Sequence, residues 1–212
     1  MISINCLLCD KEFYDELTFD NLFYIDWLCP ECKRHFMLIN FESNCPVCGN
    51  IYPCCQSGKV SNRSLYLSNE KVMEMITLVK FRHDQELLKA FKNDVKKVIR
   101  QFYKGYTLVP VPLSKSREKE RDFNQAMIIA KMSNQNICDC LSRLDDKKQS
   151  KKTLKERLTN PPKFELKYLP VCKKILIIDD IYTTGSTINS IADLFPNEYI
   201  VKALTLIRVA KK

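Results

Sequence analysis

The sequence predicts an α/β protein with a doubly wound, mostly parallel sheet and a small N-terminal zinc-binding module. Strand-like apolar runs alternate with helix-like periods from residue 65 to the end of the 212-residue chain. Eight of the 11 cysteines fall within the first 55 residues, mostly as Cys-x2-Cys pairs. We therefore expect a cysteine-rich module over residues 1–58 and an α/β domain over residues 65–212.

The cysteine pairs predict zinc rather than disulfides. The chain starts without a basic stretch followed by an apolar segment, and no apolar run approaches the ~20 residues of a membrane helix, so we expect a cytoplasmic protein without membrane insertion. In that reducing compartment, paired cysteines are typically metal ligands. The first two pairs have the spacing of a closed tetrahedral site and comprise Cys6, Cys9, Cys29 and Cys32.

A second zinc ion is a further candidate in the same module. Cys45 and Cys48 form another good pair, but the cysteines that follow, Cys54 and Cys55, are adjacent. A second site on these four and an interleaved pairing of the three Cys-x2-Cys units both remain open. His35 lies next to Phe36, which favours a packed imidazole over a metal ligand. We assign no chemistry to Cys138, Cys140 and Cys172.

The first half of the α/β domain begins with a short strand at residues 65–67. A helix with apolar positions at residues 72–79 follows, with Ser68 or Asn69 as its cap. The periodicity of residues 87–102 predicts a longer helix with one apolar and one basic face, and we expect the basic face to be solvated. Residues 106–109 predict a strand that ends at Pro110.

The second half continues the alternation. We expect a helix at residues 123–132, a short strand at residues 138–141, and a mixture of helix and loop in the charged, glycine-free residues 143–163. The apolar run at residues 174–178 is typical of a parallel strand buried on both faces. A helix after Thr184 and a last strand at residues 199–206 complete the domain.

The most specific pattern is at residues 175–187, where a buried strand delivers two carboxylates and a hydroxyl-rich loop opens a helix. Ligands of open α/β sheets bind at the carboxyl ends of strands, and a helix N-terminus suits a phosphate. The acids would accept hydrogen bonds from sugar hydroxyls or help to hold Mg²⁺. This pattern predicts a site for a phosphorylated sugar that comprises Asp179, Asp180, Thr183, Thr184, Gly185, Ser186 and Thr187.

This pattern resembles the phosphoribosyl-pyrophosphate motif of type I phosphoribosyltransferases, and the resemblance implies a fold of that kind. In that fold, a loop after an early strand meets the pyrophosphate. Here the loop would comprise Val111, Pro112, Leu113, Ser114 and Arg121. Pro110 and Pro112 preorganise the backbone there, and the following segment supplies cations at Lys115, Arg117, Lys119 and Arg121.

The order of blocks over nearly the whole chain resembles the ComF family of late-competence proteins. The blocks are the cysteine pairs, residues 109–112, residues 121–126, residues 149–160 with Arg157, and the phosphate loop. One departure is visible, because the family usually has glycine where Asp122 precedes Phe-Asn-Gln. The resemblance implies a role in natural transformation, in which imported single-stranded DNA is handled on the cytoplasmic side alongside a helicase of the same system.

Three activities are compatible with these residues. The protein could be a phosphoribosyltransferase on an unidentified acceptor, a sensor or DNA-handling scaffold that keeps the pocket without turnover, or a nucleobase salvage enzyme. The last is the weakest, because the zinc module stands where salvage enzymes carry their acceptor-binding hood. The net charge of +9 fits an anionic partner. A DNA-binding rim is expected at Lys147, Lys148, Lys151 and Lys152, unless these lysines form a solvated helix face.

Overall fold

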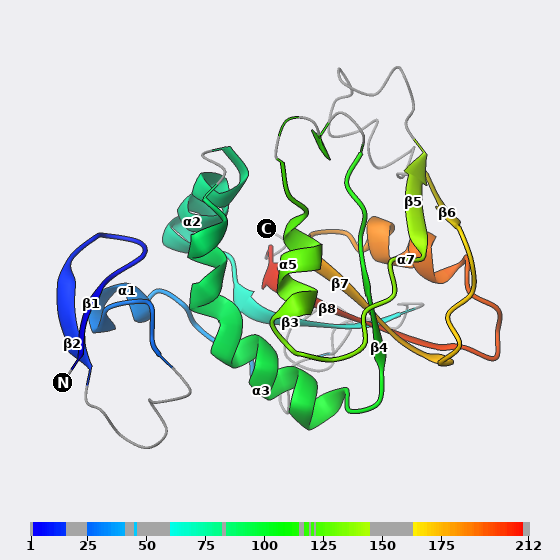
Figure 1. The fold of residues 1–212 in the computed structure, drawn as a ribbon, viewed down its shortest axis with the longest axis horizontal. Coiled ribbons are helices and arrows are strands. Elements are labelled where there is room, and N and C mark those ends of the chain that lie inside the picture. Colours follow the sequence, from blue (N-terminus) through cyan, green and yellow to red (C-terminus); the bar gives the residue numbers. More distant parts are fainter. Residues whose placement is uncertain are drawn as a thin grey trace.

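The structure is a computed structural model, and it describes residues 2–15, 25–40, 45, 60–81, 84–114, 117–118, 120, 122–144 and 163–209. Its centre is a parallel sheet of four strands in the order β3-β8-β7-β4, which are Ser61–Leu67, Ile200–Arg208, Lys174–Tyr182 and Thr107–Pro110 (Figure 1). Residues 175–178 of β7 are fully buried, as expected for a strand covered on both faces. The predicted parallel sheet is confirmed.

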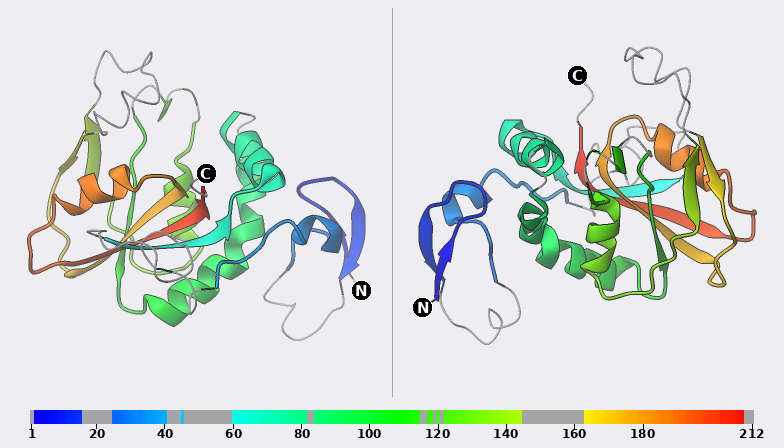
Figure 2. Two further views of the ribbon diagram at one scale, coloured as in Figure 1. Left: turned by 180° about the vertical axis from the view of Figure 1, so that it is seen from behind. Right: turned by 45° about the horizontal axis from the view of Figure 1, so that its top comes forward.

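Helices cover both faces of this sheet. Between β3 and β4 the chain forms α2 (Glu70–Phe81), the 3₁₀ helix η1 (Gln85–Phe91) and α3 (Lys92–Phe102); α5 (Gln125–Lys131) follows β4, and α7 (Ser186–Ala192) joins β7 to β8. An isolated parallel bridge places Ile137 beside Leu108 at the outer edge of β4. The connection through α5 moves toward that edge, whereas the connection through α7 moves away from it. Because both connections are right-handed, their helices lie on opposite faces of the sheet. Figures 1 and 2 show α3 and α5 on one side and α7 on the other, so the sheet is doubly wound.

The helix predicted at residues 87–102 is continuous only in its second half. Residues 85–91 form a 3₁₀ helix in which the side chain of Asp84 accepts from the backbone N–H of Glu86. The apolar positions remain correct, because Leu87, Leu88 and Phe91 are all buried. Apolar spacing alone therefore identified the buried face but not the winding of the first turns.

The strand predicted at residues 138–141 lies further along the chain. The ladder forms at β5 (Leu141–Leu144), which pairs antiparallel with β6 (Lys163–Leu166). Residues 143, 144 and 163 are therefore in strands rather than in helix or loop, and the Arg143 guanidinium lies 5.7 Å from the centroid of the Phe164 ring. Residues 145–162, the rest of the charged stretch, are outside the described part of the chain.

The N-terminal part forms a hairpin of β1 (Ile2–Asn5) and β2 (Glu12–Asp15), followed by the short helix α1 (Pro30–Lys33). Its small core of Cys6, Leu28 and Cys29 is separate from the core of the sheet. The two parts join where the Phe36 ring packs edge-on against the ring of Tyr66. The boundary predicted near residue 58 falls outside the described residues. Within the described ranges, none of the helices combines the length and apolar character needed to cross a bilayer.

Candidate functional site

Four cysteines of the N-terminal module converge on one point. Cys6 and Cys9 flank the turn after β1, and Cys29 and Cys32 lie at the start and inside α1. Pro30 is the first residue of α1, a position that suits its fixed φ, so Cys29 is held as the N-cap. All four sulfur atoms lie within 4.8 Å of one another.

This cluster fits a structural zinc ion. Four thiolates bound at about 2.3 Å in a tetrahedron stand about 3.8 Å apart, and the sulfurs of Cys9 and Cys29 are 3.7 Å apart. The backbone N–H of Cys29 donates to the sulfur of Cys6 at 3.3 Å, and that of Cys32 donates to the sulfur of Cys29 at 3.4 Å. Such N–H···S bonds orient metal-bound thiolates and stabilise their charge.

The thiols do not ionise equally without a metal. Burial raises the pKa of Cys6, but hydrogen bonds from the backbone of Cys29, Cys9 and Leu8 outweigh it and lower this pKa to about 7. Burial and the neighbouring sulfurs raise the pKa of Cys32 well above its usual range. Full ionisation of the cluster therefore requires a bound cation, which is the behaviour of a metal site.

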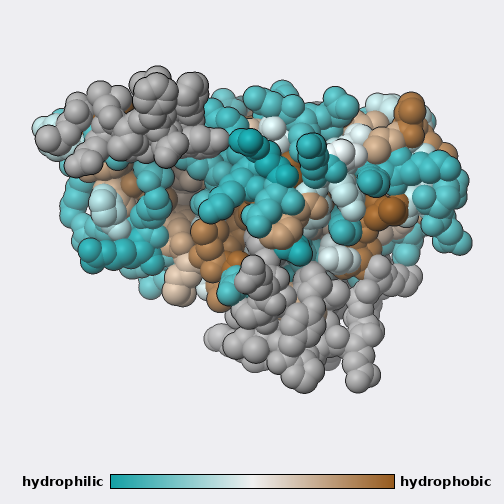
Figure 3. All heavy atoms as spheres, turned by 90° about the horizontal axis from the view of Figure 1, so that it is seen from below, coloured by the Kyte–Doolittle hydropathy of each residue, from teal (hydrophilic) through white to brown (hydrophobic). Residues whose placement is uncertain are grey.

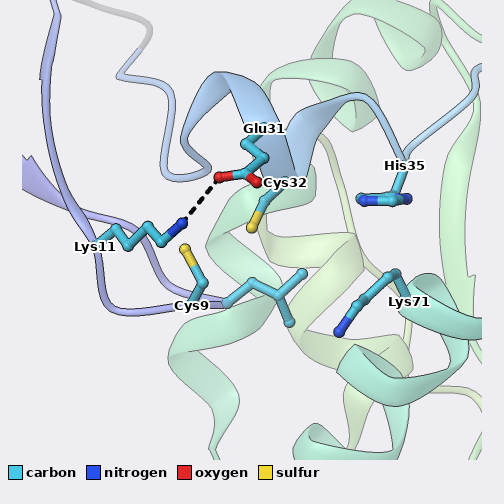
Figure 4. Close-up of a pocket in the computed structure, with 7 residues that line it drawn as sticks. Cys9, Lys11, Glu31, Cys32, His35 and Lys71 are labelled. Atoms are coloured by element: carbon cyan, nitrogen blue, oxygen red, sulfur yellow. Dashed lines mark hydrogen bonds and ion pairs between the residues drawn. The ribbon is translucent and has the colours of Figure 1, made fainter.

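The predicted second site falls largely outside the described residues. Cys45 is described and is buried, whereas Cys48, Cys54 and Cys55 lie outside the described residues. His35 is exposed and is not part of the four-cysteine group. It lines a cavity of about 200 Å³ beside Cys9 and Cys32, across which Lys11 and Glu31 pair at 3.0 Å (Figure 4). A zinc ion held by four thiolates has no open coordination position toward this cavity, so we assign no catalytic role to the zinc site.

The acid pair stands at the carboxyl end of β7, where the strand emerges from the core. Both carboxylates are half-buried, and the backbone N–H of Asp180 donates to Oδ1 of Asp179 at 2.9 Å. Nζ of Lys80, in the last turn of α2, lies 2.7 Å from Oδ2 of Asp180, and these side chains are 19% and 17% exposed. Lys80 offsets one of the two adjacent negative charges. No sequence pattern points to this ion pair, because Lys80 and Asp180 lie far apart along the chain.

Asp179 is the acid without this counterion contact. Burial and the adjacent carboxylate of Asp180 raise its pKa to about 8, although the N–H of Asp180 and the charge of Lys80 act in the opposite direction. At neutral pH and without ligand, this carboxyl group therefore retains a proton that an unfolded aspartate has lost.

The raised pKa of Asp179 predicts a stability that falls with pH. The folded chain binds this proton more tightly than the unfolded chain, so the stabilisation is full below the ordinary pKa of 3.8 and is lost as the pH rises through about 8. Asp179→Asn removes the titration. We expect its melting temperature, relative to that of the wild type, to be higher at about pH 8.5 than at about pH 5. An equal difference at both pH values in thermal unfolding would contradict the assignment.

Gly185 is fixed by two independent constraints. Its φ of +79° is left-handed, and a Cβ at this position would lie 2.4 Å from Oη and 2.8 Å from Cζ of Tyr182. The guanidinium of Arg208 lies 4.2 Å from the centroid of the Tyr182 ring and holds the ring in place. Gly185 is also the N-cap residue of α7 and has no side chain to cover the loop. Only glycine fits this position.

Gly185→Ala is expected to destabilise the fold by about 1–3 kcal/mol, from backbone strain together with the contact with Tyr182. Gly105 provides a matched control. It has the same φ of +79°, but a Cβ there meets nothing within 4 Å. Gly105→Ala should therefore show the backbone strain alone. Equal denaturant midpoints for the two variants would mean that the Tyr182 ring does not constrain the loop.

The loop after β4 starts beside the acid pair. The backbone N–H of Val111 donates to the carbonyl of Ile178 at 2.9 Å, which places the loop next to the residue that precedes Asp179. The backbone N–H of Arg117 donates to Oγ of Ser114 at 3.4 Å. Both predicted segments therefore share the carboxyl edge of the sheet. Arg121, with Lys115 and Lys119, is outside the described residues.

The segment before α5 explains the departure at Asp122. This residue has φ +57°, the left-handed conformation for which glycine is the usual choice and which aspartate tolerates better than most residues. Asp122 thus adopts the backbone conformation in which a glycine would be unstrained. Asn124 then caps α5, and its Nδ2 donates to the carbonyl of Val111 at 3.0 Å, which ties the helix to the loop.

Gln125 was not singled out from the sequence. It is 3% exposed, and its Nε2 has no hydrogen-bond acceptor among the described residues. A glutamine at a helix start normally faces solvent, so only its place in the Phe-Asn-Gln block could have indicated a special role. The lysines of the expected DNA rim, Lys147, Lys148, Lys151 and Lys152, lie outside the described residues.

Known proteins were found that are similar to this chain over most of its length. No family model matches the chain. The competence protein ComFC of Bacillus subtilis (strain 168) is 36% identical over 205 residues, which cover 87% of this chain and 85% of that protein. The competence protein ComFC of Streptococcus pneumoniae (strain ATCC BAA-255 / R6) is 33% identical over 222 residues, which cover 97% of this chain and all of that protein. The chain therefore belongs to the ComFC family of competence proteins.

Proposed function

We propose that this protein binds phosphoribosyl pyrophosphate with Mg²⁺ and assists the handling of imported single-stranded DNA in natural transformation, on the cytoplasmic side. One observation supports the choice of ligand: an acid pair lies near the carboxyl end of a buried parallel strand, and two residues further on a hydroxyl-rich loop begins that contains a left-handed glycine. The names of the two relatives support the competence role.

The arrangement suggests a role for each group. Asp179 and Asp180 would accept hydrogen bonds from the ribose hydroxyls, and Thr183, Thr184, Ser186 and Thr187 would surround the 5′-phosphate. Thr183 and Thr184 are exposed, so their hydroxyls can reach a ligand. The loop at residues 111–114 would face the pyrophosphate, because it leaves the sheet beside the acid pair.

Charge explains why Mg²⁺ belongs to this proposal. At the acid pair, two carboxylates stand against one contacting cation, the ammonium of Lys80, so this part of the site offers little positive charge to a strongly anionic ligand. Mg²⁺ prefers to bind through substrate phosphates and one or two carboxylates while keeping several waters. When bound, the ion would neutralise part of the pyrophosphate charge.

Calorimetric titration of phosphoribosyl pyrophosphate into the zinc-loaded protein tests the proposal, with ribose 5-phosphate and pyrophosphate as comparison ligands. We expect saturable binding that strengthens with Mg²⁺ and weaker binding of either fragment alone. The absence of heat and of any shift in melting temperature would rule out the site. Release of pyrophosphate with nucleobases or single-stranded DNA would then identify a transferase, and binding without release would identify a sensor or scaffold.

A further inference from the structure

The outer face of α3 carries a row of cations that takes no part in the sites described above. Lys92, Lys96 and Arg100 recur every four residues and therefore rise about 6 Å from one to the next along the helix. Lys97 lies beside them, and Lys104 follows just beyond the end of the helix. All except the half-buried Lys96 are exposed. These five residues are called the α3 cation row below.

No acidic side chain lies among the cations of the row. Asp94, the one acidic residue of the helix, instead accepts a hydrogen bond from the Tyr66 hydroxyl. Within the described ranges, no ion pair forms at Lys92, Lys96, Lys97 or Lys104. Five other surface lysines do have a carboxylate partner, namely Lys11, Lys33, Lys71, Lys89 and Lys167.

The rest of α3 holds this row rigidly. Val95, Val98 and Ile99 are buried in the core of the α/β domain, so the helix cannot rotate its cations away from solvent. Figure 1 shows α3 along the lower side of the molecule, and Figure 3, seen from below, shows hydrophilic residues gathered across the middle of this side. A fixed positive strip of this kind, whose four lysines form no ion pair among the described residues, is suited to a linear polyanion.

An aromatic side chain lies near one end of the row. Nζ of Lys89, in η1 just before α3, is 5.5 Å from the centroid of the Trp27 ring. Trp27 is half-buried, and it is the only tryptophan of the chain. Proteins that bind single strands without sequence preference combine a positively charged track with aromatic rings on which bases stack.

We propose that the α3 cation row binds the phosphate backbone of single-stranded DNA, with Trp27 close to one end of the bound strand. The aromatic ring favours a single strand over a duplex. The bases of a single strand are open to stack on an aromatic side chain, whereas those of a duplex are paired and stacked on one another. The proposal rests on the DNA-handling part of the proposed function and places that activity away from the sugar-phosphate site.

The test uses the full-length, zinc-loaded protein and a fluorescein-labelled oligo(dT) of about 20 nucleotides, a length that covers one or more typical single-strand sites. Binding is followed by anisotropy at several salt concentrations. In the α3 variant, Lys92, Lys96, Lys97 and Lys104 become glutamine, which preserves helix propensity. Each lost phosphate contact contributes about 0.7 to the slope of log K against log salt. We expect a slope reduced by about 3 and at least a tenfold loss of affinity at low salt.

The control variant removes the same charge elsewhere, by glutamine substitution at four other exposed lysines: Lys71, Lys131, Lys163 and Lys167. We expect this variant to keep the wild-type slope, and we expect Trp27 emission to change when oligo(dT) binds to the wild type. A wild-type slope in the α3 variant, an equal loss in both variants, or binding without any change in Trp27 emission would overturn the assignment of this surface. Equal affinity for a duplex of the same length would overturn the preference for a single strand.

Two further measurements separate this inference from the proposed function. The α3 variant should bind phosphoribosyl pyrophosphate as the wild type does, because the row lies outside that site. If the wild type binds no single-stranded DNA at low salt, both the assignment of this surface and the DNA-handling part of the proposed function are wrong. The phosphoribosyl-pyrophosphate site is then still tested separately, by its own calorimetric titration.

Discussion

Replacing Cys6 and Cys9 with serine is expected to remove the zinc ion and unfold the N-terminal module. The described core of this module consists of Cys6, Leu28 and Cys29, so two of its three buried apolar residues are also ligands of the cluster. Such a core cannot fold on hydrophobic burial alone, and structural zinc binding contributes apparent free energies of about 10–16 kcal/mol in small zinc domains. Zinc content measured by elemental analysis should fall by about one ion per chain.

The unfolding can be followed through Trp27. Its backbone carbonyl accepts a hydrogen bond from the N–H of Leu7 at 2.9 Å, inside the turn that joins Cys6 to Cys9. Loss of the turn should therefore shift its emission toward that of exposed tryptophan. Replacing Cys138 and Cys172 with serine removes two cysteines outside the cluster and should leave both zinc and emission unchanged. A wild-type protein purified without chelator that holds less than about half a zinc ion per chain would contradict the ligand assignment.

The second large effect is expected at the acid pair. Asp179→Asn combined with Asp180→Asn should weaken phosphoribosyl-pyrophosphate binding at least tenfold, or about 1.4 kcal/mol, because amides are poorer acceptors for sugar hydroxyls and poorer partners for Mg²⁺. The fold should survive the change. Loss of the Asp180 carboxylate leaves Lys80 without this partner, but the Lys80 side chain is 19% exposed to water.

A matched control removes two negative charges from the same domain. Asp193 and Glu198 are exposed and lie beyond α7, away from the carboxyl end of β7. Asp193→Asn with Glu198→Gln should leave the affinity within about twofold of wild type, since screened charges at this distance contribute little. A similar loss in both double variants would mean that net charge, rather than the acid pair, determines binding.

Features carried by local pattern could be predicted from the sequence. The central strand was visible because residues 175–178 form an uninterrupted apolar run, and such a run is needed for burial on both faces. The cysteine cluster was visible because each pair chelates from a single turn, so its spacing is a local property. The cap of α2 was narrowed to Ser68 or Asn69, and the structure selects Asn69, whose Oδ1 accepts from the N–H of Val72 at 2.9 Å.

Features that depend on contacts between distant segments could not be predicted. The ion pair of Lys80 with Asp180 forms only after the sheet has formed. The same holds for the position of the Tyr182 ring between Arg208 and Gly185. The β5–β6 hairpin joins two segments on either side of a long charged stretch, which hides the strand period. The α3 cation row was visible as a basic helix face, but the absence of ion pairs at its four lysines, among the described residues, is a property of the folded surface.

The most direct test of this account is a calorimetric titration of phosphoribosyl pyrophosphate, with Mg²⁺, into three proteins: the wild type, the Asp179→Asn and Asp180→Asn variant, and the Asp193→Asn and Glu198→Gln control. The account predicts saturable binding to the wild type, nearly the same affinity in the control, and at least tenfold weaker binding in the acid-pair variant. Wild-type affinity in the folded acid-pair variant would show that the carboxyl end of β7 is not the ligand site.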